Sequence, residues 1–185
     1  YTKLIYALGA KSFVPPIPGS EKEQVAVIRT LEDAEKIGQM IPKNGQTVVI
    51  GGGVLGLEAA WELKKAGCQV TVLEVAPVLM GRQLDEGAAA MLGSIAESVG
   101  RIEGQERVTA VRLADGEEIA ANLVLISCGV RANTELAEQM GLKVNRAVAV
   151  NEKMQTSEKD IYACGDCVEF EGENAAHGHR NSAPV

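Results

Sequence analysis

The sequence has few aromatic residues, no basic run and no long apolar stretch. Aromatics make up 3% of the 185 residues, and the formal net charge is −7. This balance argues against nucleic acid or an anionic membrane surface as the main partner. Every apolar stretch is far shorter than the roughly 20 residues of a transmembrane helix. The sequence therefore predicts neither a nucleic-acid-binding protein nor a membrane protein.

Cysteine is also scarce, with four residues in the whole chain. That number is too small for a disulfide scaffold in a chain of this length, and each cysteine lies beside an apolar run. Reduced structural thiols and a cytoplasmic location are expected. The first residues, Tyr1 to Tyr6, do not form a signal peptide. Because there is no initiator Met, we expect Tyr1 to begin inside a longer protein.

The clearest local pattern is a strand, a glycine-rich turn, a helix and a second strand. Gln46–Ile50 and Gln69–Glu74 are strand-like, and Val54–Ala66 has helical periodicity. This βαβ unit predicts parallel strands and an α/β fold. The stripe expected to face the sheet is made by Leu57, Ala60, Trp61 and Leu63.

The remaining pattern predicts shorter elements around this unit. Three prolines make Ser12–Gly19 an extended linker, and Thr30 and Asp33 have the spacing of a capping box for a helix ending near Met40. The other expected elements are a strand at Lys3–Leu8, a helix at Asp85–Val99, a hairpin of Arg107–Leu113 with Glu117–Ala120, a strand at Asn122–Ser127, a helix at Thr134–Met140, and strands at Val148–Asn151 and Asp160–Ala163.

The turn Gly51-Gly52-Gly53-Val54-Leu55-Gly56 has the form G-x-G-x-x-G in the context that a dinucleotide site needs. Gly51 permits the tight turn, Gly53 lets a pyrophosphate approach the backbone, and Gly56 lets the helix pack on the strand. The helix amides, including those of Val54 and Leu55, would then face the diphosphate. The alternative is a plain βαβ turn that binds nothing.

Glu74 ends the second strand, 23 positions after Gly51. An acid near this spacing accepts hydrogen bonds from the adenosine ribose hydroxyls. Since its charge would repel a 2′-phosphate, NADH is favoured over NADPH. Three other charged residues could either contact the ligand or lie on the solvated surface. They are Glu58 in the helix, and Arg82 and Arg131 after strand ends. If Arg82 contacts the ligand, it would lie near the adenosine end.

Cys164-Gly165-Asp166-Cys167 has the form C-x-x-C, which occurs in redox dithiols and zinc sites. Only His177 and His179 could complete a zinc site, and their spacing is not that of a usual finger. No helix of thioredoxin-like pattern follows the pair. We therefore assign neither a metal site nor a catalytic residue from the sequence.

Six segments resemble, in order, the FAD-dependent pyridine nucleotide-disulfide oxidoreductases. They cover about residues 1–174: Tyr1–Ala10, Phe13–Gly19, Arg29–Asp33, Val49–Glu58, Cys128–Asn133 and Thr156–Val168. Met80–Asp85 favours the subgroup of NADH:rubredoxin reductases and nitrite reductase large subunits. The resemblance implies a Rossmann-like parallel sheet with helices on both faces and an antiparallel β-meander.

The same resemblance implies an NAD(H)-binding domain at 33–151, inserted into an FAD-binding domain whose parts are 1–32 and 152–185. NADH would contact the turn and Glu74, and Glu58 and Gly129 would border the nicotinamide. Gly9 would lie near the flavin, and Gly165 and Asp166 would hold FAD. Two departures matter: the family's first glycine-rich motif is absent, and a strand with its turn is expected to be missing between Gly100 and Arg101.

The function expected from these observations is electron transfer. Hydride would pass from NADH to FAD in the complete protein, and electrons would leave to an acceptor protein or small molecule; this chain alone is expected to be inactive. Oligomer formation is left open. Two rivals remain: a free-standing NAD-binding sensor without chemistry, and a dithiol reductase that uses Cys164 and Cys167.

Overall fold

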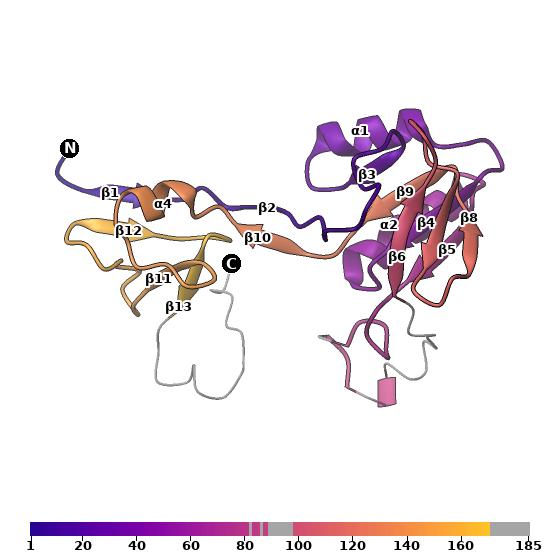
Figure 1. Cartoon of the computed structure of the whole chain (residues 1–185). Helices are drawn as coiled ribbons and strands as arrows, with labels where there is room; N and C mark the ends of the chain where they lie inside the picture. Colours follow the sequence, from indigo (N-terminus) through magenta and orange to yellow (C-terminus); the bar gives the residue numbers. More distant parts are fainter. Residues whose placement is uncertain (82, 86, 89–97, 171–185) are drawn as a thin grey trace. The chain divides into compact units, whose positions relative to one another are not determined.

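The computed structural model describes residues 1–81, 83–85, 87–88 and 98–170 of the chain (Figure 1). Its contacts divide the chain into two compact units. We call Ser12–Gly129 the central unit, and Tyr1–Lys11 with Val130–Val185 the terminal unit. The domain edges expected from the sequence, near 33 and 151, therefore differ from the edges of the compact units.

The central unit is built on a four-stranded parallel sheet. Its order is β3 (Val25–Val27), β9 (Leu123–Ile126), β4 (Gln46–Ile50) and β5 (Gln69–Leu73). Ile50 at the end of β4 pairs with Leu73 on one side and with Ile126 on the other. All four residues of β9 are buried, as expected for a central parallel strand covered on both faces.

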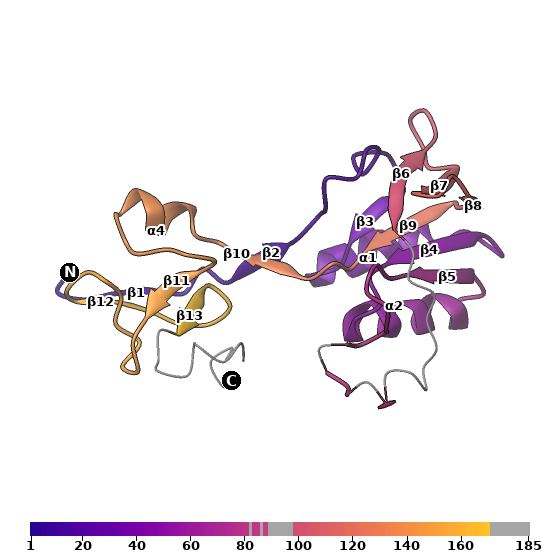
Figure 2. The same ribbon diagram turned by 60° about the horizontal axis from the view of Figure 1, so that its bottom comes forward.

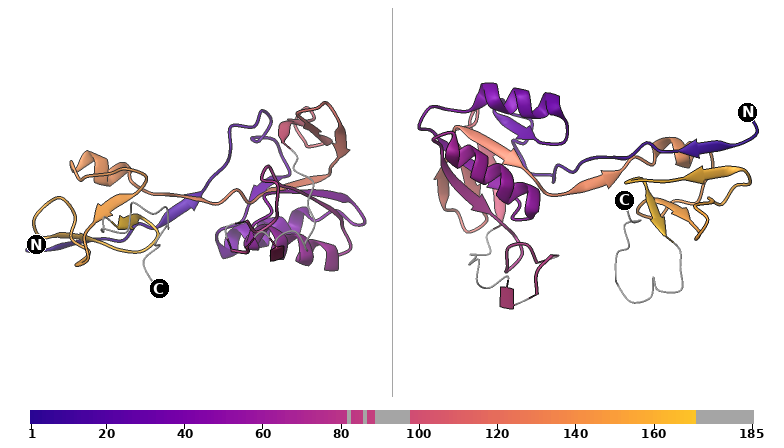
Figure 3. Two further views of the ribbon diagram at one scale, coloured as in Figure 1. Left: turned by 90° about the horizontal axis from the view of Figure 1, so that it is seen from below. Right: turned by 180° about the vertical axis from the view of Figure 1, so that it is seen from behind.

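Two helices cover one face of this sheet. The helices α1 (Leu31–Met40) and α2 (Val54–Lys65) lie on the same side of the strands (Figure 3). Their buried residues Ile37, Ala60 and Leu63 join the sheet residues Val49, Leu123 and Leu125 in one core cluster. The predicted capping box is present, because Thr30 accepts from the Asp33 backbone while the Asp33 side chain accepts from the Thr30 backbone.

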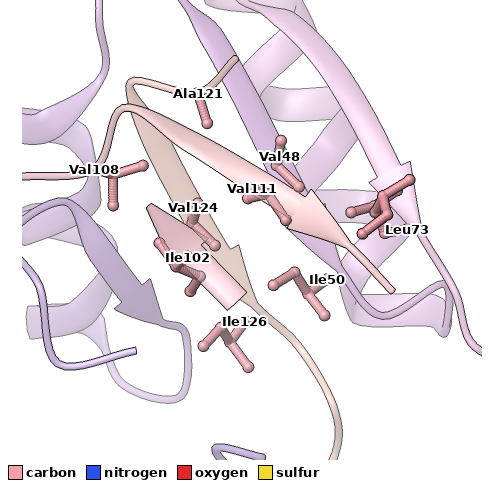
Figure 4. Close-up of a cluster of buried hydrophobic side chains, with 10 residues drawn as sticks. Val48, Ile50, Leu73, Ile102, Val108, Val111, Ala121, Val124 and Ile126 are labelled. Carbon is pink, nitrogen blue, oxygen red and sulfur yellow. The ribbon is translucent and has the colours of Figure 1, made fainter. Parts of the chain in front are cut away.

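An antiparallel sheet covers the opposite face. It has the order β6 (Val99–Glu103), β7 (Ala110–Leu113) and β8 (Glu118–Ala120) (Figure 2). The sheet residues Val48, Ile50, Val124 and Ile126 point toward it, since neighbouring side chains on a strand face opposite ways (Figure 4). The fold class and the meander are confirmed. The expected helices on both faces are not found among the described residues, because the meander occupies the second face.

A strand that the sequence did not predict follows the proline-rich linker Ser12–Gly19. Val25–Val27 forms β3, which pairs in parallel with β9. Its three apolar residues are half-buried, and its neighbours Glu23 and Gln24 are polar. Such a short edge strand forms because it pairs with its neighbour, and its own sequence pattern does not predict it.

The prediction for the region around Gly100 was wrong at its boundary. Val99 begins strand β6 rather than ending a helix, and most of the expected helix Asp85–Val99 lies outside the described residues. Gly100 and Arg101 lie within this single strand, at an irregularity in its pairing with β7. The expected missing strand would fall at this bulge.

The stripe predicted for α2 was wrong at Trp61. Gly56, Ala60 and Leu63 are the buried residues of α2, whereas the Trp61 side chain is 63% exposed. Each residue turns a helix by about 100°, so Trp61 points away from the face that Ala60 shares with the sheet. The sole tryptophan of the chain therefore lies on the surface of the central unit.

In the described part of the terminal unit, short strands form three pairs and one short helix is present. The strand β1 (Leu4–Tyr6) pairs in parallel with β12 (Ile161–Ala163), and β11 (Val148–Val150) pairs in parallel with β13 (Val168–Phe170). The ribbon of β2 (Ala10–Ser12) and β10 (Val130–Ala132) is the third pair, and α4 spans Glu135–Gln139. Their core includes Tyr6, Ala137, Val148 and Cys167. Among all described residues, no helix is long and apolar enough to cross a membrane.

Candidate functional site

The carboxyl ends of β4, β5 and β9 meet at one edge of the parallel sheet. Gly51 follows β4, Glu74 follows β5, and Cys128 and Gly129 lie just beyond β9. Hydrogen bonds from Gly51 to Leu73 and from Ser127 to Ile50 continue the pairing into these turns. This edge is where open α/β sheets collect their ligands.

The glycine-rich turn is shaped by close backbone contacts. Gly51 has a φ of +115°, and a Cβ there would overlap the carbonyl of Ser127. A Cβ on Gly56 would overlap the carbonyl of Gly51, so a side chain would force α2 away from the strand. In contrast, a Cβ on Gly53 would meet nothing within 4 Å. Two glycines therefore serve packing, and Gly53 borders open space.

The helix α2 begins at this open space without a side-chain cap. Its N-cap residue Gly53 is extended, no side chain accepts from the first turn, and that turn carries no acidic residue. A helix start of this kind presents backbone N–H groups and the positive end of the helix dipole. Val54 and Leu55, the first two helical residues, are exposed. The arrangement is suited to an anionic group.

The Glu74 carboxylate is held by two backbone groups. Its Oε2 accepts from the N–H of Gly52 at 2.7 Å, and its Oε1 accepts from the N–H of Ala76 at 2.8 Å. Each carboxylate oxygen has a second lone pair, so two acceptor positions remain for a ligand. The side chain expected to contact a ribose therefore also organises the turn.

A cavity of about 850 Å³ opens between the glycine-rich turn and the segment after β5. Its volume lies within the roughly 300–1,000 Å³ of small-molecule sites. Residues 51–55, 73–78 and 127–129 contribute to its lining, and the lining residues that the structure describes all lie in the central unit. Pro15 and Ile17 of the proline-rich segment form another part of the wall. Sequence reasoning missed them, because only the fold brings them to the glycines.

The Cys128 thiol lies at the same cavity. Its Sγ donates to the carbonyl of Ile50 at 3.5 Å. Burial raises the pKa of this thiol, and the nearby negative charge of Glu74 raises the same pKa further. Cys128 is therefore a protonated, weakly nucleophilic thiol at neutral pH.

The other residues expected to contact NADH differ in their positions. Gly129 has a φ of +89° and lines the cavity. Glu58 is exposed on α2, one turn beyond Leu55, and is not part of the cavity wall. Arg82 lies outside the described residues.

The three residues expected near FAD all lie in the terminal unit. Gly9 comes three residues after β1, and Gly165 and Asp166 come two and three residues after β12. Since β1 and β12 are parallel and paired, all three residues lie at one end of this strand pair. Gly9 and Gly165 both have a positive φ, +62° and +82°.

The C-x-x-C pair is divided between surface and core. Cys164 is exposed, whereas Cys167 is fully buried and its Sγ donates to the carbonyl of Cys164 at 3.1 Å. This environment is typical of a structural thiol. In the part of the chain that the structure describes, no three potential metal ligands gather, and His177 and His179 lie outside that part.

Comparison with known proteins identifies the same family along almost the whole chain. The sequence model described as pyridine nucleotide-disulphide oxidoreductase matches residues 1–182. This match reaches beyond residue 174, where the resemblance seen in the sequence was expected to end. The nitrite reductase [NAD(P)H] of Bacillus subtilis is 40% identical over 182 residues, which are 93% of this chain and 23% of the relative.

Two further comparisons agree. The rubredoxin-NAD(+) reductase of Pseudomonas putida is 36% identical over 178 residues, covering 90% of this chain and 46% of the relative. The crystal structure of a ferredoxin reductase from Rhodopseudomonas palustris has a TM-score of 0.90 and 30% identity, covering 99% of this chain and 48% of that one. The chain thus spans less than half the length of these proteins. It belongs to the pyridine nucleotide-disulphide oxidoreductase family.

Proposed function

We propose that this chain provides the NADH-binding part of a flavoprotein oxidoreductase similar to rubredoxin and nitrite reductases. The observation that carries the proposal is the cavity at the carboxyl edge of the parallel sheet. One wall is a glycine-rich turn with an uncapped helix start, and a carboxylate follows the neighbouring strand. A dinucleotide needs these features together: room for its pyrophosphate, backbone donors and a ribose acceptor.

The pyrophosphate would lie next to Gly53, where the backbone leaves open space beside the start of α2. The adenosine ribose then lies toward Glu74, whose free acceptor positions suit its hydroxyls. Glu74 is the only carboxylate among the described residues that line the cavity. Its negative charge would repel a 2′-phosphate, which makes NADH the favoured cofactor over NADPH.

The remaining NADH contacts follow the direction of the dinucleotide. With its adenosine at Glu74, its nicotinamide lies toward the β9 end of the cavity, which Gly129 lines. Glu58, one turn along α2 from the cavity, is a candidate to reach the nicotinamide side. Arg82 stays a candidate for the adenosine end.

FAD belongs to the complete protein in this proposal. Gly9, Gly165 and Asp166 lie at one end of the strand pair β1 and β12, and this end would contact the flavin cofactor. Residues 1–32 and 152–185 would be parts of the FAD-binding domain, and 33–151 would be the NAD(H)-binding domain. FAD supplies the hydride acceptor and releases electrons onward. The acceptor would be a small protein, as the names of the rubredoxin and ferredoxin reductases indicate for those relatives, or a small molecule.

The decisive experiment uses the complete protein from which this sequence comes. With FAD bound, anaerobic addition of NADH should bleach the flavin absorbance, and an added rubredoxin or ferredoxin should restore it. Cys164→Ser, which removes the exposed thiol of the C-x-x-C pair, should leave both the bleaching and its reversal by the acceptor unchanged, whereas a dithiol reductase would lose electron transfer to its acceptor. NADH binding without any bleaching would instead support a sensor and contradict the proposal.

A further inference from the structure

The backbone of Gly52 is held at both its N–H and its carbonyl by the segment after β5. Its N–H donates to Oε2 of Glu74 at 2.7 Å, and its carbonyl accepts from the N–H of Met80 at 3.0 Å. The Leu79 side chain fills the space where a Gly52 side chain would lie. The middle of the glycine-rich turn is therefore fixed by contacts from residues far along the chain.

Glu74 links the Gly52 backbone to the start of the segment after β5. Its second oxygen accepts from the N–H of Ala76 at 2.8 Å. The carboxylate thus bridges two backbone donors, one in the glycine-rich turn and one in the segment after β5. Hydrogen bonds to an ionised acceptor are stronger than neutral ones, and partial burial shields these two from water.

The segment that Glu74 anchors is itself a wall of the cavity. All but one of residues 75–81 contribute to the lining. Met80 has a φ of +53°, and its carbonyl accepts from the N–H groups of Gln83 and Leu84. The wall turns sharply at Met80, next to the bond that Met80 makes to Gly52. Its position depends on the Gly52 peptide.

We propose that Glu74 is a positioning residue that locks residues 75–81 onto the glycine-rich turn. Through this lock, the phosphate-facing backbone and the wall beside the adenosine form one preformed surface. The role is separate from any bond between Glu74 and the ribose. It rests on the proposed function, in which this cavity binds NADH.

The lock and the ribose contact predict different results for Glu74→Gln. A glutamine offers an acceptor to one backbone N–H but an NH₂ group to the other, so it cannot bridge both donors. If Glu74 only contacts the ribose, the loss of its charge should improve NADPH binding and should weaken the binding of NADH more than that of an analogue without the 2′-hydroxyl. If Glu74 locks the wall, the variant should bind every dinucleotide more weakly, including one without a 2′-hydroxyl.

The test compares three dinucleotides on the full chain: NADH, NADPH and the 2′-deoxyadenosine analogue of NADH. Binding is followed by energy transfer from Trp61, the sole tryptophan, to the reduced nicotinamide. We expect Glu74→Gln to lower the affinities for NADH and for its 2′-deoxy analogue by similar factors, on the order of tenfold, with no gain in affinity for NADPH. Glu62→Gln, on the exposed surface of α2, is the matched control and should leave the affinities for all three dinucleotides unchanged.

Amide hydrogen exchange without ligand provides a second, independent measurement. The N–H groups of Gly52 and Ala76 should exchange faster in Glu74→Gln and remain protected in Glu62→Gln. Glu74→Asp, which keeps the charge at a shorter reach, should still discriminate against NADPH while binding NADH more weakly than the wild type. It therefore keeps the test valid if the glutamine variant unfolds.

Two results would overturn the lock. One is unchanged exchange at Gly52 and Ala76, and the other is a Glu74→Gln variant that keeps the affinity for the 2′-deoxy analogue and gains affinity for NADPH. Failure of the proposed function has a different signature. In that case the wild-type chain would bind none of the three dinucleotides, while the exchange measurement would still report on the lock.

Discussion

At the scale of single residues, the glycines of the turn have different tasks. Gly51 and Gly56 are required by contacts within the protein, because a side chain at either would overlap a backbone carbonyl. Gly53 has no such contact and faces open space. Packing and ligand binding can therefore be separated by substituting one glycine at a time.

Gly53→Ala and Gly56→Ala should fail in different ways. Gly53→Ala should lower the free energy of unfolding by about 1 kcal/mol or less, which is the cost of alanine at an N-cap. The same substitution should lower the affinity for NADH at least about tenfold. Gly56→Ala should lower the free energy of unfolding by roughly 1–3 kcal/mol through overpacking. Urea unfolding and NADH titration of both variants measure the two effects. Equal NADH affinity of Gly53→Ala and the wild type would argue against a pyrophosphate next to Gly53.

The Cys128 thiol should report the charge of Glu74. Since that charge raises the Cys128 pKa in addition to burial, Glu74→Gln should lower the pKa toward its ordinary value without removing the effect of burial. The pH dependence of Cys128 alkylation, followed by mass spectrometry, should shift to lower pH. A Cys164→Ser background removes the exposed thiol from the measurement. An unchanged midpoint would mean that the Glu74 charge does not act on Cys128.

At the scale of elements, α1 depends on its capping box. Hydrogen bonds from the N–H groups of Thr30 and Arg29 lower the pKa of the Asp33 carboxyl, with the Thr30 bond the larger cause. The lowered pKa means that the charged form stabilises the folded state. This stabilisation is complete above the ordinary pKa of aspartate and is lost as the pH falls through the lowered value.

Two substitutions test this cap by urea unfolding. Thr30→Ala should lower the free energy of unfolding by about 1 kcal/mol at neutral pH, because Asp33 loses the hydroxyl that accepts from its backbone. Asp33→Ala should be destabilising at neutral pH, and its penalty should shrink in acid, where the wild-type carboxylate is protonated. Glu35→Ala on the exposed side of α1 is the control. A pH-independent penalty for Asp33→Ala would contradict the role of its charge.

The sequence predicted elements that carry their own local signal. The strand β4, the glycine-rich turn and α2 were predicted because a short continuous apolar run, a group of glycines and a helical period of 3.6 follow one another. The strands β3, β10 and β13 were missed because each is a three-residue segment that lacks a longer apolar run or a turn signal of its own and forms only against its partner. Trp61 was assigned to the buried stripe because an apolar residue one position off the period is hard to distinguish locally.

At the scale of the whole molecule, one compact unit supplies every described residue of the cavity wall. The first of these residues in the chain is Pro15 and the last is Gly129, and the unit spans Ser12–Gly129. The sequence identified Gly51, Glu74 and Gly129, because a motif or the resemblance singled them out. It could not identify Pro15, Ile17 or the bonds of Gly52, since these depend on segments that meet only in the folded chain.

A calorimetric titration of this chain with NADH and, in parallel, NADPH tests most directly whether the cavity is a dinucleotide site. We predict one saturable site that binds NADH more tightly than NADPH, because the described lining lies within one unit and the Glu74 charge would repel a 2′-phosphate. A cooperative unfolding transition in the same sample establishes that the chain is folded. Tighter binding of NADPH, or a folded chain that binds neither dinucleotide, would contradict the proposed NADH site.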